Sequence, residues 1–294
     1  MPVSSDVFIR RLSGYSGARV DLLKSTKDVR LFVRKSVGQE RRAERLRQQY
    51  QKQQAALAEG INTPAIIGAG ESPAGFFFEM EYVPGMSAAE AIAHQHEFSL
   101  NLFIHEIGNA LHVFAQSSHG FIPSTQFHEK IKNVARFSLE NNCASKFRTE
   151  IAQIEQFLHH YDWEGFPQSA CHGDFSMENV LFGRDGRVYF IDFDAPDLSS
   201  FFLDLSKLYQ DLSGYWCLRK IREEPIRFNN ASNLLNMVRQ AVFQLCRKFE
   251  VQDCQMQAGT LLHLFRIVPY LTSAEDASFL MDRIFFLQKN WSDL

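Results

Sequence analysis

The architecture of this chain follows from two neighbouring segments, Cys171-His-Gly-Asp-Phe-Ser-Met-Glu-Asn-Val-Leu181 and Val188-Tyr-Phe-Ile-Asp-Phe-Asp194. They place Asp174 and Asn179 five residues apart and then set Asp192 at the end of an apolar, strand-like run. Phosphoryl transfer from a metal-bound nucleotide needs a carboxylate that faces the acceptor hydroxyl, together with hard oxygen ligands for Mg²⁺. Asp174 is the candidate for the first role, and Asn179 and Asp192 are the candidates for the second.

These residues resemble the catalytic loop and metal-binding strand of the aminoglycoside phosphotransferase and choline kinase superfamily, the small-molecule branch of the protein-kinase-like fold. The resemblance is sharpest over residues 171–194 and extends, in the expected order, from about residue 8 to about residue 210. It implies an α+β, two-lobed protein-kinase-like fold with a small antiparallel-sheet N-lobe and a mostly helical C-lobe. It also implies an ATP- and Mg²⁺-dependent kinase with Asp174 as catalytic base and Asn179 and Asp192 as the Mg²⁺ ligands.

The composition is that of an ordinary globular protein of 294 residues, with 45% hydrophobic and 22% charged residues. A net charge of −3 gives no electrostatic argument for a nucleic-acid partner. The five cysteines are widely spaced and contain no C-x-x-C, which disfavours disulfides and zinc and favours a reducing compartment. No apolar run reaches about 18 residues, so we expect no membrane span and a cytoplasmic protein. Nothing in the sequence indicates the oligomeric state.

The order of the expected elements agrees with two lobes. Short β-type runs surround one helix in the first third of the chain, with strands at 7–12, 18–23, 29–34, 65–68 and 76–83 and a helix at 38–59. Pro84-Gly85 then breaks the chain, and helical patterns dominate, with at least four helices after residue 199. We therefore expect a nucleotide-binding lobe over 1–83 and a helical lobe over 84–294. The helical lobe would contain the catalytic loop (171–194) and substrate-binding helices (199–294), and the active site would lie between the lobes.

The expected nucleotide contacts come from weaker motifs. The loop Leu12-Ser-Gly-Tyr-Ser-Gly-Ala18 could cover the ATP phosphates with backbone N–H groups, with Ser16 and Gly17 as the contacts. The same residues also suit a plain hairpin turn. Farther along, the backbone of Glu81 and Val83 is expected to bind the edge of the adenine, as the resemblance implies.

A kinase of this type needs a cation on its third strand to hold the α and β phosphates. Strand alternation places Arg34 and Lys35 on opposite faces, so only one can point into the site, and the resemblance favours Arg34. The superfamily pairs this cation with a helix Glu, but the matching position here is Gln48, with Glu44 one turn earlier. Either Glu44 takes that role in a shifted register, or a neutral Gln replaces the ion pair.

Two further aspartates follow the expected metal ligands. Asp194 stands two residues after Asp192, where it is a candidate for a second metal contact or for a turn residue before Ala195-Pro196. Asp204 matches an Asp-Leu pair downstream of the metal-binding Asp in the superfamily, and the resemblance implies that it anchors the catalytic loop by hydrogen bonds.

The acceptor is the least determined part of the reaction. A protein kinase is disfavoured, because Gly173 stands where those enzymes carry Arg and too few residues separate Asp192 from Asp204 for an activation segment. From residue 200 onward acidic and basic residues are nearly balanced, so no acidic basin for a polycationic aminoglycoside is evident. Part of an aromatic cage for choline could come from Tyr209, Tyr215 and Trp216.

We therefore expect transfer of the γ-phosphate of ATP to a hydroxyl of a small neutral or anionic metabolite, most simply a sugar or sugar derivative. The cluster Arg219-Lys220-x-Arg222 could favour an acidic or phosphorylated group. A choline, amino-alcohol or aminoglycoside kinase is the alternative. An inactive kinase-like nucleotide-binding module is the alternative of a different class, because the helix Glu is in doubt.

Overall fold

The computed structural model describes residues 6–12, 18–38, 40–72 and 75–291. Its contacts separate into two compact units, Met1–Met86 with Asn179–Ala195, and Ser87–Glu178 with Pro196–Leu294. The first unit is built on an antiparallel sheet and the second is helical, which confirms the predicted α+β, protein-kinase-like class. The division at residues 83 and 84 stays a prediction; by their contacts, residues 179–195 group with the first strands.

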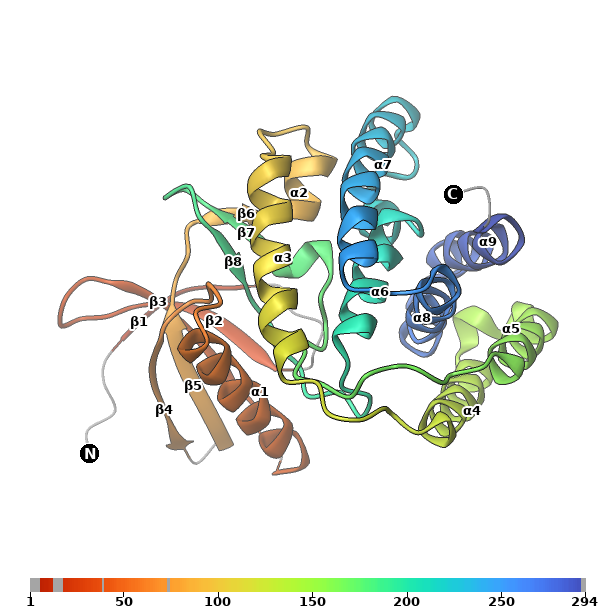
Figure 1. Ribbon diagram of the computed structural model, residues 1–294. Coiled ribbons are helices and arrows are strands. Elements are labelled where there is room, and N and C mark those ends of the chain that lie inside the picture. Colours follow the sequence, from red (N-terminus) through yellow and green to blue (C-terminus); the bar gives the residue numbers. More distant parts are fainter. Residues whose placement is uncertain (1–5, 13–17, 39, 73–74, 292–294) are drawn as a thin grey trace. The chain divides into compact units, whose positions relative to one another are not determined.

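A five-stranded antiparallel sheet and one helix form the centre of the first unit (Figure 1). The strand order is β1-β2-β3-β5-β4, with bounds Val7–Arg11, Arg19–Lys24, Leu31–Ser36, Gly75–Glu81 and Ile66–Ser72 in that order. Helix α1 (Glu40–Ala58) contains neither Pro nor Gly, and it ends just before Gly60. Gly60 has a φ of 82°, in the left-handed region that favours glycine, so it ends the helix as predicted.

Strand alternation decides which side chains of β3 and β5 meet α1. One face carries the apolar core, which joins Val33, Phe76, Phe78 and Met80 of the strands to Ala43 and Leu46 of the helix. Lys35 shares the face of Val33, because residues two apart in a strand point the same way. Arg34 therefore lies on the opposite face, directly across from Glu79 in the register of β3 and β5.

A small second sheet carries the end of the catalytic segment. It has the order β6-β7-β8, with bounds Gly85–Ser87, Val180–Gly183 and Val188–Phe190. Gly85 allows a close approach of backbones, because a Cβ at this position would collide with the carbonyl oxygen of Phe182. Beyond the β7–β8 ladder, the Ile191 N–H donates to the Asn179 carbonyl oxygen at 3.0 Å. This bond places the backbone of Asn179 beside the residue that precedes Asp192.

The second unit consists of helices, whose bounds are α2 Ala88–Ala93, α3 Leu100–Gln116, α4 Ser124–Glu140, α5 Arg148–His160, α6 Phe201–Leu212, α7 Pro225–Lys248, α8 Asp253–Phe265 and α9 Ala274–Asn290. Short 3₁₀ turns lie between them at η1 Asn142–Phe147, η2 Met177–Asn179, η3 Trp216–Ile221 and η4 Val268–Tyr270. The predicted capping box of Ser87 and Glu90 is present at the start of α2. Within the described part of the chain, four α-helices follow residue 199, in agreement with the prediction.

Helices α6 and α8 approach each other closely. A Cβ on Gly259 of α8 would collide with the hydroxyl of Ser206 on α6, and the Thr260 hydroxyl lies 3.4 Å from the Ser206 carbonyl oxygen. One turn later, Nε2 of His263 lies 2.9 Å from the Leu203 carbonyl oxygen. The second half of α8 is therefore fixed in position against the first half of α6.

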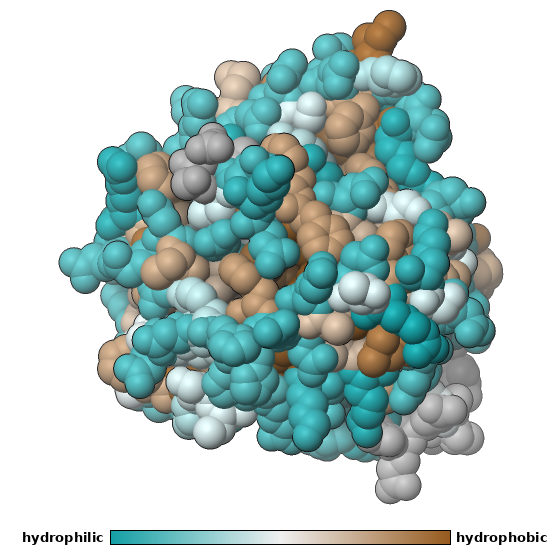
Figure 2. Space-filling model, turned by 90° about the vertical axis from the view of Figure 1, so that its right-hand side faces the viewer, coloured by the Kyte–Doolittle hydropathy of each residue, from teal (hydrophilic) through white to brown (hydrophobic). Residues whose placement is uncertain are grey.

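None of the described helices is long and apolar enough to cross a membrane. On the face shown in Figure 2, hydrophilic and hydrophobic residues are mixed. Exposed apolar side chains such as Ile226 and Tyr270, each 81% exposed, are common on folded proteins.

Candidate active site

The loop that carries Asp174 is held by a buried carboxylate on α6. Asp204, 2% exposed, accepts hydrogen bonds from the backbone N–H groups of His172 at 2.5 Å and Gly173 at 2.8 Å. Gly173 has a φ of 90°, a conformation that a side chain would make strained. The Asp174 N–H in turn donates to Nδ1 of the buried His172 at 3.3 Å. The predicted anchoring role of Asp204 is confirmed.

A second buried carboxylate, which we did not predict from the sequence, holds the other end of this loop. Asp211 accepts hydrogen bonds from the backbone N–H groups of Met177 at 2.9 Å and Cys217 at 3.0 Å. Its burial, and next the charge of Glu178, raise the pKa of Asp211 to about 6. The α6 residues Asp204 and Asp211 are two turns apart, so one face of this helix is used to fix the loop.

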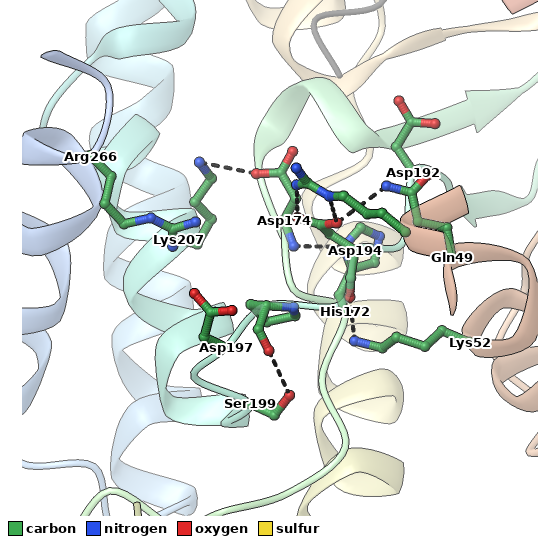
Figure 3. A network of polar contacts seen from close by, with 12 residues as sticks. Gln49, Lys52, His172, Asp174, Asp192, Asp194, Asp197, Ser199, Lys207 and Arg266 are labelled. Carbon is green, nitrogen blue, oxygen red and sulfur yellow. Dashed lines mark hydrogen bonds and ion pairs between the residues drawn. The ribbon is translucent and has the colours of Figure 1, made fainter. Parts of the chain in front are cut away.

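Asp174 itself forms an ion pair within the second unit. Nζ of Lys207, on α6, lies 3.0 Å from Asp174 Oδ1 (Figure 3), and the Asp174 side chain is 43% exposed. Burial raises the pKa of Asp174, but the Lys207 ammonium, with smaller contributions from His172 and Arg266, outweighs it and leaves the pKa below its ordinary value. Asp174 is therefore ionised at neutral pH, the state required of a base. Lys207 was also not predicted, although it lies at i+3 from Asp204 on the same face of α6.

Asp192 forms an ion pair within the first unit. Its Oδ1 lies 3.1 Å from Nζ of Lys35, whose side chain is 2% exposed, whereas that of Asp192 is 36% exposed. Asp192 also has a φ of 61°, in the left-handed region that aspartate tolerates better than most residues. Such conformations persist only where the surroundings impose them, and they are frequent at ligand sites. The carboxylate of Asp192 is thus fixed by one cation while part of it stays accessible.

The expected orientation of the strand cation is wrong. Arg34 pairs with Glu79, at 2.5 Å between Nη2 and Oε1, and its guanidinium stacks 5.2 Å from the centre of the Phe77 ring. These groups lie on the face of the sheet opposite the α1 core, whereas Lys35 lies with Asp192. Arg34 and Lys35 are both basic, so their residue types alone did not show which of them points into the site. A shift of one residue reverses the face of a strand side chain.

Neither candidate for the helix carboxylate pairs with a strand cation among the described residues. Gln48 and Glu44 are exposed on α1, and the amide of Gln48 donates to Glu44 at 3.3 Å. The buried polar positions of this helix are instead Gln49 and Gln53. The superfamily's helix Glu is therefore not reproduced by either residue.

Asp194 links the end of the second sheet to α1 within the first unit. Its carboxylate accepts hydrogen bonds from Arg45 Nε at 2.9 Å and from the buried Gln49 amide at 3.2 Å (Figure 3 shows Gln49). Lys52 donates to its carbonyl oxygen. Burial raises the pKa of Asp194, but these bonds, Arg45 first, lower it to about 2 overall. Asp194 therefore fastens the helix, and its role as a metal contact remains a prediction.

The remaining predicted contacts belong to the nucleotide. Ser16 and Gly17 lie outside the described residues. Glu81 ends β5, and its N–H donates to the Ala65 carbonyl oxygen at 2.9 Å. Val83 follows two positions later and is partly buried. The adenine contact expected of Glu81 and Val83 stays a prediction.

The donor set of the first unit fits a magnesium ion. Over the described ranges, no group of three or more His, Cys, Asp or Glu residues could hold a metal. Mg²⁺ needs no such group, because it is usually bound through one or two protein oxygens together with substrate phosphates and water. Asn179 and Asp192 supply donors of this kind, and the bond between Asn179 and Ile191 holds the backbone of Asn179 beside the residue that precedes Asp192.

Comparison with known proteins agrees with this chemistry. Residues 8–227 match the model of a family described as the phosphotransferase enzyme family. No curated protein sequence matches the chain.

Solved structures of several small-molecule kinases share its fold. A choline kinase from Streptococcus pneumoniae aligns with a TM-score of 0.58 at 14% identity, over 98% of this chain and 94% of that one. An aminoglycoside-3'-phosphotransferase of type VIII aligns with a TM-score of 0.53 at 15% identity, over 95% and 94%. An ethanolamine kinase from Plasmodium vivax aligns with a TM-score of 0.52 at 13% identity, over 97% and 82%.

At these identities the structures show the fold alone, whereas the family match covers most of the chain and includes the loop of Asp174 and the strand of Asp192. The chain belongs to the phosphotransferase enzyme family and is a small-molecule kinase, which transfers phosphate to a hydroxyl group.

Proposed function

We propose that this protein transfers the γ-phosphate of ATP, with Mg²⁺, to a hydroxyl of a small metabolite. The observation that carries the proposal is the pairing of Asp174 with Lys207, on a loop that two buried carboxylates hold in place. Phosphoryl transfer depends mainly on positioning and on charge neutralisation. A rigid loop with an accessible carboxylate supplies the positioning.

Asp174 orients the acceptor hydroxyl and receives its proton. The hydroxyl oxygen forms a bond to the γ-phosphorus as the bond from phosphorus to the β–γ bridging oxygen breaks, and ADP leaves with that electron pair. Lys35 is the cation proposed to hold the α and β phosphates. Asn179 and Asp192 would hold Mg²⁺, which would neutralise phosphate charge.

The rest of the nucleotide is assigned to the backbone. Glu81 and Val83 would bind the adenine edge, and Ser16 and Gly17 would cover the phosphates. An inactive module is the weaker proposal, because a binding scaffold does not require an acceptor-facing carboxylate that is kept ionised.

The acceptor is proposed to be a neutral or anionic hydroxyl metabolite, a sugar or sugar derivative in the simplest case. The structural neighbours include kinases of choline, ethanolamine and aminoglycosides, so the fold does not select one acceptor. The nearly balanced charges of the last third of the chain support a neutral or anionic acceptor over a polycation.

The test is a screen for acceptor-dependent ADP release with sugars, sugar acids, sugar phosphates, choline, ethanolamine and kanamycin. The phosphorylated product is confirmed by mass spectrometry, and Asp174→Asn serves as the inactive control. We expect product from at least one hydroxyl acceptor. ATP binding without product from any acceptor would instead establish an inactive nucleotide-binding module.

Lys35→Met is expected to cost far more activity than Arg34→Met. Lys35 is buried beside Asp192, whereas Arg34 pairs with Glu79 on the other face of the sheet. A lost contact to a charged phosphate corresponds to roughly a 10- to 100-fold loss in kcat/KM for ATP. Steady-state kinetics with varied ATP, and thermal unfolding of both variants, provide the measurement. If both variants fold and Arg34→Met loses more activity than Lys35→Met, the phosphate contact belongs to Arg34 instead.

A further inference from the structure

Two cationic side chains approach Asp174 from neighbouring helices of the second unit. Lys207 extends from α6 to within 3.0 Å of Asp174 Oδ1. Arg266, which follows the last residue of α8, lies on the same side of Asp174 as Lys207 in the view of Figure 3. The charges of both lower the pKa of Asp174. One ammonium is enough to pair with one carboxylate, so pairing with Asp174 does not explain why a second cation, Arg266, is placed near it.

A buried histidine holds Arg266 in place. His263 is 3% exposed, and its Nε2 lies 2.9 Å from the Leu203 carbonyl oxygen, which can only accept a hydrogen bond. Nε2 therefore carries the proton, and Nδ1 is left to accept a hydrogen bond from Nη1 of Arg266 at 3.3 Å. Burial, followed by the charges of Arg266 and Lys207, lowers the pKa of His263 well below its usual value, so the ring is neutral. A neutral ring positions the guanidinium without cancelling its charge.

The carboxylates around this cluster are already in use. Lys130 on α4 also lies within electrostatic range of His263, and it pairs with Asp197 at 2.9 Å. Asp204, on the same face of α6 as Lys207, accepts two backbone hydrogen bonds from the catalytic loop. Over the residues that the structure describes, Arg266 has no carboxylate partner of its own.

A guanidinium fixed in this way within electrostatic range of the catalytic carboxylate attracts anions and repels cations. We propose that the acceptor carries an anionic group, a carboxylate or a phosphate, which Arg266 binds together with Lys207 while Asp174 faces the acceptor hydroxyl. This inference rests on the proposed function and specifies its acceptor. It also disfavours choline, ethanolamine and aminoglycosides, whose ammonium groups would approach two cations.

The preference is measured with matched acceptors that share a hydroxyl and differ in charge. One series is glycerol, glycerate and glycerol 3-phosphate, and a second is glucose, gluconate and glucose 1-phosphate. Choline and ethanolamine are the cationic members. We expect kcat/KM to be roughly 10- to 100-fold higher for an anionic member than for its neutral counterpart, the range of one charge-assisted hydrogen bond. Within each series, comparison of kcat/KM for the carboxylate and the phosphate member shows which anion the site binds.

Arg266→Gln tests the residue directly. We expect it to raise KM for the preferred anionic acceptor by roughly 10- to 100-fold, to abolish the preference over the neutral counterpart and to change KM for ATP less. Arg247→Gln is the matched control, because Arg247 is an exposed arginine of the same unit that stacks on Phe243. Arg266→Lys keeps the charge and should recover part of the preference. If the Arg266→Gln protein is unstable, the anion preference is measured on Arg266→Lys instead.

The split between the two KM values separates acceptor binding from phosphoryl binding. Replacement of an acceptor-binding Arg266 raises KM for the acceptor far more than KM for ATP, whereas replacement of a phosphoryl-binding Arg266 raises KM for ATP at least as much. A preference for neutral or cationic acceptors, or an unchanged anion preference in Arg266→Gln, overturns the inference but not the proposed kinase activity. If no acceptor of any charge yields product although ATP binds, the proposed function fails, and this inference fails with it.

Discussion

Asp174→Asn is expected to abolish turnover, with kcat falling by about 10²–10⁴ and nucleotide affinity remaining near that of the wild type. Asparagine keeps the shape of the side chain but can neither accept the acceptor proton nor pair with Lys207. The loop itself should survive, because Asp204 and Asp211 bind its backbone rather than the Asp174 side chain. Single-turnover product formation and calorimetric ATP titration measure the two effects separately.

Asp282→Asn is a matched control for this experiment. Asp282 is an exposed aspartate of α9 in the same unit, and its replacement should leave kcat unchanged. Thermal unfolding of both variants confirms that the fold is retained. Turnover close to wild type in a folded Asp174→Asn protein would exclude Asp174 as the base.

The local parts of the fold could be predicted, because their causes lie within a few residues. The capping box of Ser87 and Glu90 and the end of α1 at Gly60 are both present in the structure. The role of Asp204 was also found from the sequence, since it follows the metal strand at a spacing typical of the superfamily. For the capping box and the helix end, the signal and the structure that it produces share one short segment, whereas Asp204 bonds a loop about thirty residues earlier and was found through the resemblance.

The face of the strand cation could not be predicted, because it depends on a single residue of register. Arg34 and Lys35 are adjacent and both basic, and only the alignment of β3 against β5 shows that Lys35 meets Asp192.

The substrate side of the site could not be predicted for a different reason. Lys207 and Arg266 are 59 residues apart in sequence and come together only because α6 packs on α8. A partial signal did exist, since Asp204, Lys207 and Asp211 lie at helical spacing, and this places three charged groups on one face of a mostly apolar helix. Charged residues on a buried helix face are costly unless they have partners, so this face was a candidate for contact with the catalytic loop.

Asp192→Asn is expected to remove the Mg²⁺ dependence of ATP binding and to lower activity by at least about 10²-fold, because a charged metal ligand becomes a neutral one. The same change leaves the buried Lys35 without its counter-charge. Breaking a buried ion pair from one side typically costs 3–5 kcal/mol, and Asp192 is 36% exposed, so we expect about 1–3 kcal/mol of lost stability. Calorimetry with and without Mg²⁺ and chemical denaturation measure the two effects.

A second variant separates the loss of metal binding from the loss of stability. Lys35→Met combined with Asp192→Asn removes both charges, so part of the stability should return while Mg²⁺-dependent binding does not, because the metal ligand is still missing. Asp185→Asn is the control on the same hairpin, since Asp185 is exposed and bonds Tyr189 and the Arg187 backbone. ATP affinity that still rises with Mg²⁺ in folded Asp192→Asn would place the metal on other residues, and Lys35 and Asp192 would then form a purely structural pair.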